Sequence, residues 1–156
     1  MALQRFIVLT AGGGPSDDDL RCGLAWLLSR PEADLHIALP TAALRKTFLG
    51  KLHKWRPEIG TPLKTHGVVR FKNATLTISI ARPDFQARAN GACLLLWGNS
   101  GEAEQVEKRL GSVGAIYVVP FSTTSNTWKT ANDPIELNCR ALMASDDPQG
   151  AAATQT

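Results

Sequence analysis

The residues from Phe6 to Leu20 constrain the fold of this chain more than any other stretch. The apolar run Phe6–Leu9 leads into Gly12–Gly14, and Ser16 then precedes an acidic, leucine-containing segment. An apolar run before a glycine-rich turn predicts a buried strand, and Ser16 followed by Asp19 resembles a capping box at a helix start. Such a junction is a common ligand site in α/β proteins, because glycine lets the backbone approach a ligand and a helix N-terminus attracts anions.

The rest of the chain alternates apolar runs with helical patterns. Helical spacing or capping signals predict helices over 16–28, 41–55 and 98–111. Apolar or alternating runs predict further strands at 34–39, 67–71, 75–80, 93–97 and 115–119. The strands at 67–71 and 75–80 are expected to form a hairpin, the second with Thr77 and Ser79 facing outward.

Three stretches have weaker patterns. Residues 57–66, rich in Pro, Gly and Thr, are expected to be a loop, and so is the polar stretch 122–132, which Trp128 anchors. The sequence Asp133-Pro134-Ile135-Glu136 predicts a helix start, with an acidic N-cap and proline at the first helical position. Its inner face would carry Ile135, Cys139 and Leu142.

This order of elements predicts an α/β fold. We expect a three-layer, Rossmann-like domain with a mostly parallel sheet and an antiparallel hairpin. Residues 1–144 are expected to form a single α/β domain. Residues 145–156 offer little to bury and are expected to be a disordered C-terminal tail.

The cysteines and the apolar runs bear on the compartment. The three cysteines, Cys22, Cys93 and Cys139, lie far apart and lack the spacing of a zinc site. We interpret them as small buried hydrophobes in a reducing compartment, which indicates a cytoplasmic protein. Nothing resembles a membrane span of about 20 apolar residues or a signal peptide, so no membrane partner is expected.

The first glycine turn matches neither common nucleotide signature in full. A P-loop needs a lysine after its last glycine, whereas Pro15 and Ser16 follow Gly14 here. A dinucleotide fingerprint needs a third glycine where Asp17 stands. The acidic run Asp17–Asp19 would also repel a phosphate placed on it. A ligand-facing loop and a turn that only caps a helix both stay open.

A second glycine-containing turn, 98–101, also joins a predicted strand to a helix. We expect both turns at the carboxyl edge of the sheet, where they would bind a phosphate-bearing, nucleotide-like ligand. Positive charge would come from Arg82 or Arg45. The predicted ligand-binding residues of the two turns are Gly12, Gly13, Gly14, Ser16, Gly98, Asn99 and Ser100.

Charge is distributed unevenly along the chain. Residues 40–90 contain ten basic and two acidic side chains, a net charge of +8, whereas the other residues carry −5. This asymmetry favours an alternative function, a non-catalytic interaction module that contacts nucleic acid or an acidic protein through a basic helix and hairpin. A solvated basic surface explains the same charges. The predicted anionic-partner surface consists of Arg45, Lys46, Lys54, Arg70 and Lys72.

No catalytic residue, cofactor or oligomeric state follows from these patterns. None of His36, His53 and His66 is paired in sequence with a nucleophile, and neither a GxSxG nor an HExxH motif occurs. Ser16 and Ser100 are expected to act as helix caps. A metal-dependent hydrolase working through Asp17 or Asp84 is a third hypothesis, and no metal site is assigned.

Overall fold

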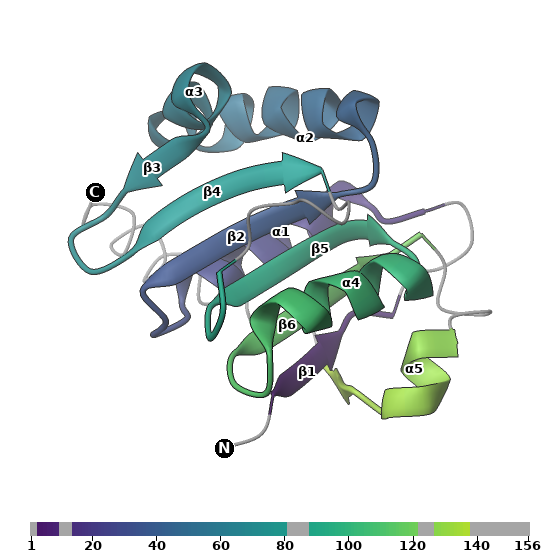
Figure 1. The fold of residues 1–156 in the computed structure, drawn as a ribbon. Coiled ribbons are helices and arrows are strands. Elements are labelled where there is room, and N and C mark those ends of the chain that lie inside the picture. Colours follow the sequence, from purple (N-terminus) through teal and green to yellow (C-terminus); the bar gives the residue numbers. More distant parts are fainter. Residues whose placement is uncertain (1–2, 10–13, 81–87, 122–126, 138–156) are drawn as a thin grey trace.

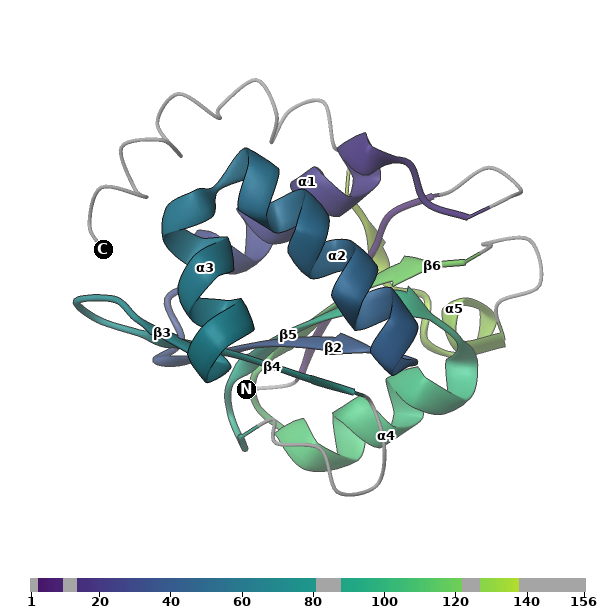
Figure 2. The ribbon, with the colours of Figure 1, turned by 90° about the horizontal axis from the view of Figure 1, so that it is seen from above.

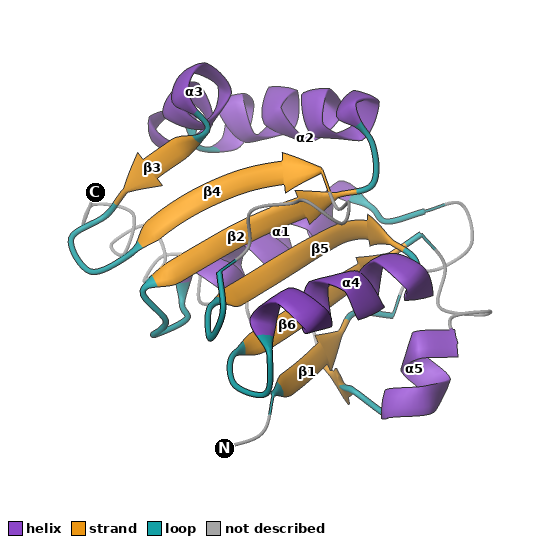
Figure 3. Ribbon diagram, viewed as in Figure 1, coloured by secondary structure: helices purple, strands orange, loops and turns teal. Residues whose placement is uncertain are grey.

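Seven strands form one sheet in the computed structural model, which describes residues 3–9, 14–80, 88–121 and 127–137 (Figure 1). Along the sheet the order is β3-β4-β2-β5-β6-β1-β7. Every described strand pair is parallel except β3 with β4 (Figure 3). The strands are β1 (Gln4–Ile7), β2 (Asp34–Leu39), β3 (Val68–Arg70), β4 (Thr75–Ile80), β5 (Ala92–Gly98), β6 (Ala115–Pro120) and β7 (Ile135–Glu136).

Helices cover both faces of the sheet. Figure 2 shows α1, α2 and α3 on one face and α4 on the other, and α5 contacts α4. The predicted α/β, three-layer architecture with an antiparallel hairpin at one edge is therefore confirmed. The helices are α1 (Asp17–Leu28), α2 (Ala42–Trp55), α3 (Pro57–His66), α4 (Ser100–Leu110) and α5 (Thr127–Asn132).

The apolar core is split into two parts by the sheet. On the face of α1, α2 and α3, Phe48 is buried in the same cluster as Leu94 of β5. On the other face, Val106 and Trp128 are buried with Leu95 of β5. Neighbouring residues of a strand point to opposite faces, so both faces of the central strand β5 are buried. That double burial explains its continuous apolar sequence.

The stretch 57–66 is helix α3, so the prediction of a loop is wrong. Pro57 occupies its first turn, where proline is tolerated, but Pro62 lies inside the helix. The helix forms because Ile59 and Leu63, four residues apart, are buried against the core. Tertiary packing outweighs the low helix propensity of this segment.

The predicted helix from Asp133 is also wrong. Ile135 and Glu136 form β7, which pairs in parallel with Phe6 and Ile7 of β1. Asp133 has a left-handed φ of 45°, whereas an N-cap residue is extended. The two residues extend the sheet at β1 instead of starting a helix. Cys139 and Leu142 lie outside the described residues.

The polar stretch after β6 is helical where it is described. Residues 127–132 form α5 rather than a loop, and Trp128 within it is buried. Residues 122–126 lie outside the described part of the chain. The buried indole supplies the packing that the polar sequence around it lacks.

The two cysteines within the described residues are buried thiols. Cys22 belongs to α1, and burial in β5 raises the pKa of the Cys93 thiol well above its usual range. These two positions fit the interpretation as buried hydrophobes, and Cys139 lies outside the described residues. In the described part of the chain, no helix combines the length and apolar character that a bilayer crossing requires.

Candidate ligand site at the carboxyl edge of the sheet

The two glycine turns flank the end of the same strand, β6. Gly98, at the end of β5, is the register partner of Pro120 in β6. The next residue, Phe121, lies against Gly14 of the other turn: a Cβ atom on Gly14 would be 3.5 Å from the Phe121 ring. Adjacent strands are about 4.8 Å apart, so roughly 10 Å separates the ends of β5 and β1. The structure brings the described parts of the two turns to one edge.

The chain connections change from one face of the sheet to the other at this edge. The helix after β1 packs on one face of the sheet, and the helix after β5 packs on the other (Figure 2). In open parallel sheets, ligands bind outside the carboxyl ends of the strands where successive connections leave toward opposite faces. That change of face occurs here on either side of β6.

The end of β5 has a strained backbone. Trp97 has a left-handed φ of 51°, which is rare for a bulky residue, and the pairing with β6 shifts register between Leu96 and Gly98. A Cβ atom on Gly98 would lie 2.4 Å from Leu95 Cγ, so the turn requires glycine there. Strain of about 1–3 kcal/mol at one residue is commonly stored at functional sites.

Each helix start at this edge is capped by its own side chains. In α1 the Asp19 N–H donates to Ser16 Oγ at 3.1 Å, and the Ser16 N–H donates to Asp19 Oδ2 at 3.0 Å. In α4 the same reciprocal pair joins Asn99 and Glu102, at 2.9 Å in both directions. Ser16 is confirmed as a cap, whereas the cap of α4 is Asn99 and not Ser100.

The two helix starts differ in negative charge. The first turn of α1 holds Asp17, Asp18 and Asp19, and that of α4 holds only Glu102. The Glu102 carboxylate is already engaged with the Asn99 N–H. An anion is therefore repelled less at the start of α4 than at the start of α1.

The other residues predicted for the ligand site and for the basic surface do not lie together. Gly12, Gly13 and Arg82 lie outside the described residues. The predicted basic surface is split: its α2 residues line a groove between α2 and α3, while Arg70 belongs to β3 and Lys72 to the β3–β4 turn. The groove lining includes Arg45, Lys46 and Lys54.

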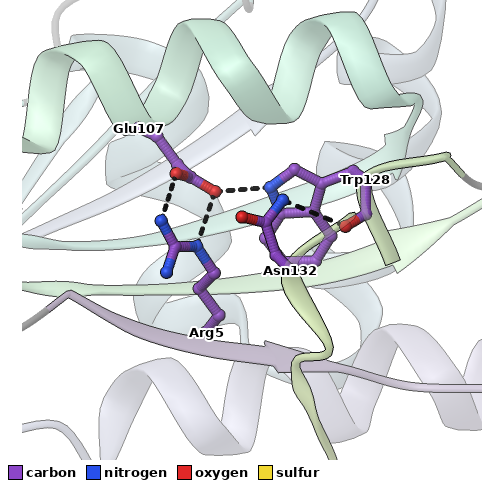
Figure 4. Close-up of polar contacts among 4 residues, drawn as sticks. All are labelled: Arg5, Glu107, Trp128 and Asn132. Atoms are coloured by element: carbon purple, nitrogen blue, oxygen red, sulfur yellow. Dashed lines mark hydrogen bonds and ion pairs between the residues drawn. The ribbon is translucent and has the colours of Figure 1, made fainter. Parts of the chain in front are cut away.

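Polar contacts around Trp128 of α5 connect this helix with α4 and β1 (Figure 4). Its indole N–H donates to the Glu107 carboxylate, which also accepts from Arg5 Nη2 at 2.8 Å and Nε at 3.0 Å. The hydrogen bonds to Glu107 raise the pKa of Arg5. The Trp128 backbone N–H donates to Ser100 Oγ at 2.9 Å. Trp128 is 1% exposed, so its predicted role as an anchor is confirmed.

Sequence reasoning missed a polar cluster between β2 and β4. His36 is 3% exposed, with Nδ1 2.6 Å from Thr77 Oγ1 and Nε2 2.7 Å from Ser79 Oγ. Burial lowers the pKa of His36 from its usual 6.5 to about 4, so the imidazole is neutral at pH 7. The predicted alternation is present, with Leu76 and Ile78 in the core and Thr77 and Ser79 on the opposite face, but on that face the two hydroxyls contact His36. Two features of the sequence indicated this cluster: the polar residues on one face of the strand at 75–80, and His36 within the apolar strand at 34–39.

The acidic residues do not gather around a metal in the part of the chain that is described. Within these residues no group of three or more His, Cys, Asp or Glu side chains is placed to hold an ion. Asp17 instead pairs with Lys51 of α2, with Oδ1 and Nζ 2.8 Å apart. Asp84, the other acid of the hydrolase hypothesis, lies outside the described residues.

Comparisons with known proteins give the chain no family. No family model and no curated protein match it. Among solved structures it is similar to the large terminase of a thermophilic bacteriophage in complex with ADP, with a TM-score of 0.45 and 12% identity over 92% of this chain and 42% of that one. Another crystal form of that terminase matches with a TM-score of 0.38 and 13% identity over 87% and 39%. The chain spans less than half the length of these proteins, and a likeness this distant assigns it no activity.

Proposed function

We propose that the protein binds a phosphate-bearing, nucleotide-like ligand at the carboxyl edge of its sheet. The observation that carries the proposal is the convergence of two turns on the end of β6, where Gly14 lies against Phe121 and Gly98 lies beside Pro120. Had the turns ended on distant strands, no single ligand would contact both.

The apolar part of such a ligand has a surface available on β6 and β1. Phe121 is 58% exposed and Leu9, after β1, is 52% exposed, although large apolar side chains are normally buried. Small-ligand sites are mostly apolar with a few placed polar groups. An aromatic ring stacked on Phe121 accounts for this exposure, and a nucleobase is such a ring.

The phosphate belongs on the β5 side of the edge. The three aspartates of α1 repel it, whereas α4 begins with Asn99 and a single engaged carboxylate. The N-terminus of α4 attracts an anion through its backbone N–H groups and its dipole. The hydroxyl of Ser100 accepts from Trp128, so we assign the contribution of Ser100 to its backbone N–H.

A thermal-shift panel of ATP, GTP, NAD and ribose 5-phosphate tests this proposal. A ligand present at 100 times its Kd stabilises the folded state by about 2.7 kcal/mol, which raises Tm by about 5–10 °C in a protein of this size. If none of these compounds raises Tm at millimolar concentration, the proposal is wrong.

Three variants distinguish the phosphate side of the site from the base side. Asn99→Asp keeps a good helix cap but adds a negative charge, so it should weaken binding of every phosphate compound about tenfold, whereas Asn99→Ser, an uncharged cap, should not. Phe121→Ala should weaken the nucleotides but leave ribose 5-phosphate unchanged. Equal affinities for Asn99→Asp and Asn99→Ser would contradict the placement of the phosphate.

A further inference from the structure

A groove of about 940 Å³ runs between α2 and α3 on the outer side of the helical layer. The two helices are joined through Arg56 alone and lie side by side (Figures 1 and 2). Their inward residues, such as Phe48 and Leu63, are buried in the core. The groove lies on other residues of the same helices, spaced three and four apart along α2, so it follows the length of that helix.

The middle of the groove is apolar and has an open notch. Leu49 and Gly50 line it halfway along α2. A Cβ atom on Gly50 would meet no atom within 4 Å. Glycine inside a helix costs about 0.5–1 kcal/mol relative to alanine, and packing does not require it here. The missing side chain keeps the groove open at its centre.

Every charged side chain that lines the groove is basic. Its lining contains no carboxylate, and four of its side chains are cationic: Arg45, Lys46, Lys54 and Lys64. Among the described residues none of these four has an ion-pair partner. In contrast, Lys51 on the same helix pairs with Asp17, and Arg56 at its end pairs with Glu58. Positive charge is left uncompensated where the groove lies.

We propose that this groove binds an acidic amphipathic helix of a partner protein. Such a helix places apolar residues at i, i+3 or i+4 and i+7 into an apolar groove, and here its largest apolar residue fills the notch at Gly50. Carboxylates flanking that apolar face then meet the four cations. An α-helix is about 10–12 Å wide with its side chains, which suits a surface formed by two adjacent helices.

Nucleic acid fits the same surface less well. Single strands are bound by aromatic side chains that stack on successive bases, and the groove is lined by no Phe, Tyr or Trp, its one aromatic ring being the imidazole of His53. A phosphate backbone gains nothing from the apolar middle of the groove or from the notch. The basic residues Arg70 and Lys72 lie on the hairpin and do not line the groove, so the cationic lining follows the helix pair.

This proposal is independent of the ligand site at the carboxyl edge. The groove shares no lining residue with the turns at Gly14 and Gly98. Loss of nucleotide binding would leave the groove proposal intact, and loss of peptide binding would leave the ligand site intact.

Fluorescence anisotropy of the full chain with labelled probes tests the groove. The first probe is a helical peptide of three Leu-Glu-Glu-Ala-Leu-Glu-Lys heptads, and its control is a scrambled peptide of the same composition. Poly-glutamate, single-stranded DNA and duplex DNA test charge alone. The helical peptide should bind at least tenfold more tightly than the scrambled peptide, with affinity that falls as salt rises.

Three variants connect that binding to the groove. Gly50→Leu fills the notch and should weaken the peptide about tenfold, and Lys46→Glu with Lys54→Glu should weaken it at least as much. The matched control is Arg70→Glu with Lys72→Glu, the same change of charge off the groove, which should have little effect. Circular dichroism and Tm verify that each variant folds. Should Gly50→Leu fail to fold, Gly50→Ala, which adds one methyl group at an open position, replaces it and should weaken the peptide by a smaller factor.

Several results would overturn the proposal. One is peptide affinity unchanged by both filling of the notch and the charge reversal at Lys46 and Lys54. Another is DNA binding tighter than peptide binding and insensitive to Gly50→Leu, which would make the surface a general polyanion site. Equal binding of the helical and scrambled peptides, or no binding of any probe, would also contradict it.

Discussion

The indole N–H of Trp128 and two nitrogens of Arg5, Nε and Nη2, donate to one acceptor group, the carboxylate of Glu107. This carboxylate therefore links α5, β1 and α4, which are distant in sequence. It lies on the face of the sheet opposite α1, α2 and α3, where α4 and α5 form the covering layer (Figures 2 and 4). One acidic side chain therefore helps to hold α5, beside the Ser100 contact and the burial of Trp128.

Glu107→Gln should destabilise the protein by about 1–3 kcal/mol. The amide keeps one acceptor oxygen but turns an NH₂ group toward the donors of Arg5 and Trp128, which leaves a largely buried donor unsatisfied. Urea unfolding followed by tryptophan fluorescence measures the change. Glu104→Gln on the exposed side of α4 is the control and should change stability by less than about 0.5 kcal/mol. Equal effects of the two variants would show that the shared carboxylate contributes nothing.

Stability should fall as pH drops from 7 to 4 because of His36. Its pKa in the folded protein is about 4, below the usual 6.5 of the unfolded chain, so the unfolded state binds a proton first. The folded state is favoured fully above pH 6.5 and loses about 3 kcal/mol by pH 4. Urea unfolding at half-unit intervals of pH measures the slope.

The histidine controls for that experiment are available in the chain. His36→Gln removes the titrating group and should flatten the slope between about pH 6.5 and pH 4.5, whatever its effect at pH 7. The matched substitution at an exposed histidine is His53→Gln on α2. A slope that persists in His36→Gln would assign the pH dependence to other groups.

Alanine substitution of Gly50 and of Gly60 should change the free energy of unfolding in opposite directions. A Cβ atom on Gly60 would lie 2.7 Å from the backbone nitrogen of His53, which cannot move without shifting α2. Gly60→Ala should therefore cost about 1–2 kcal/mol, since overpacking exceeds the gain in helix propensity. Gly50→Ala, in open space, should stabilise by up to about 1 kcal/mol. Thermal unfolding measures the stability of both variants. A stabilising effect of Gly60→Ala would show that α2 and α3 have room to separate.

The thiols of Cys22 and Cys93 should be unreactive in the folded protein. Both are buried, and the raised pKa of Cys93 disfavours the reactive thiolate. In a Cys139→Ser background, Ellman's reagent at pH 8 should label neither thiol before unfolding and both in guanidinium chloride. Rapid labelling of the folded variant would indicate local opening of the sheet or of α1.

Sequence patterns predicted the elements whose packing and local signals agree. The strands at 34–39 and 93–97 and the helix after Ser16 were found because apolar periodicity and capping residues coincide there. The helix at 57–66 was missed because Pro62 argues against it locally, while the burial of Ile59 and Leu63 that favours it depends on how α3 packs beside α2 and β3. The prediction of a helix from Asp133 was wrong because a local pattern does not show pairing with a distant strand. The partner of β7 is β1, at the other end of the described chain.

The candidate sites were predicted only in part. The two glycine turns could be found locally, but their meeting at β6 depends on strand order, which no local pattern specifies. The groove residues Lys46 and Lys54 were found from charge. The notch at Gly50 was not predicted, because the sequence does not show that the space beside this glycine is empty.

Both margins of the described sheet are short: β3 has three residues and β7 has two. A foreign strand added at either margin would form few main-chain hydrogen bonds. Short edge strands limit edge-to-edge aggregation, which matters here because the central strands are among the most apolar segments of the chain. We therefore expect partner proteins to bind side-chain surfaces of the molecule and not the margins of its sheet.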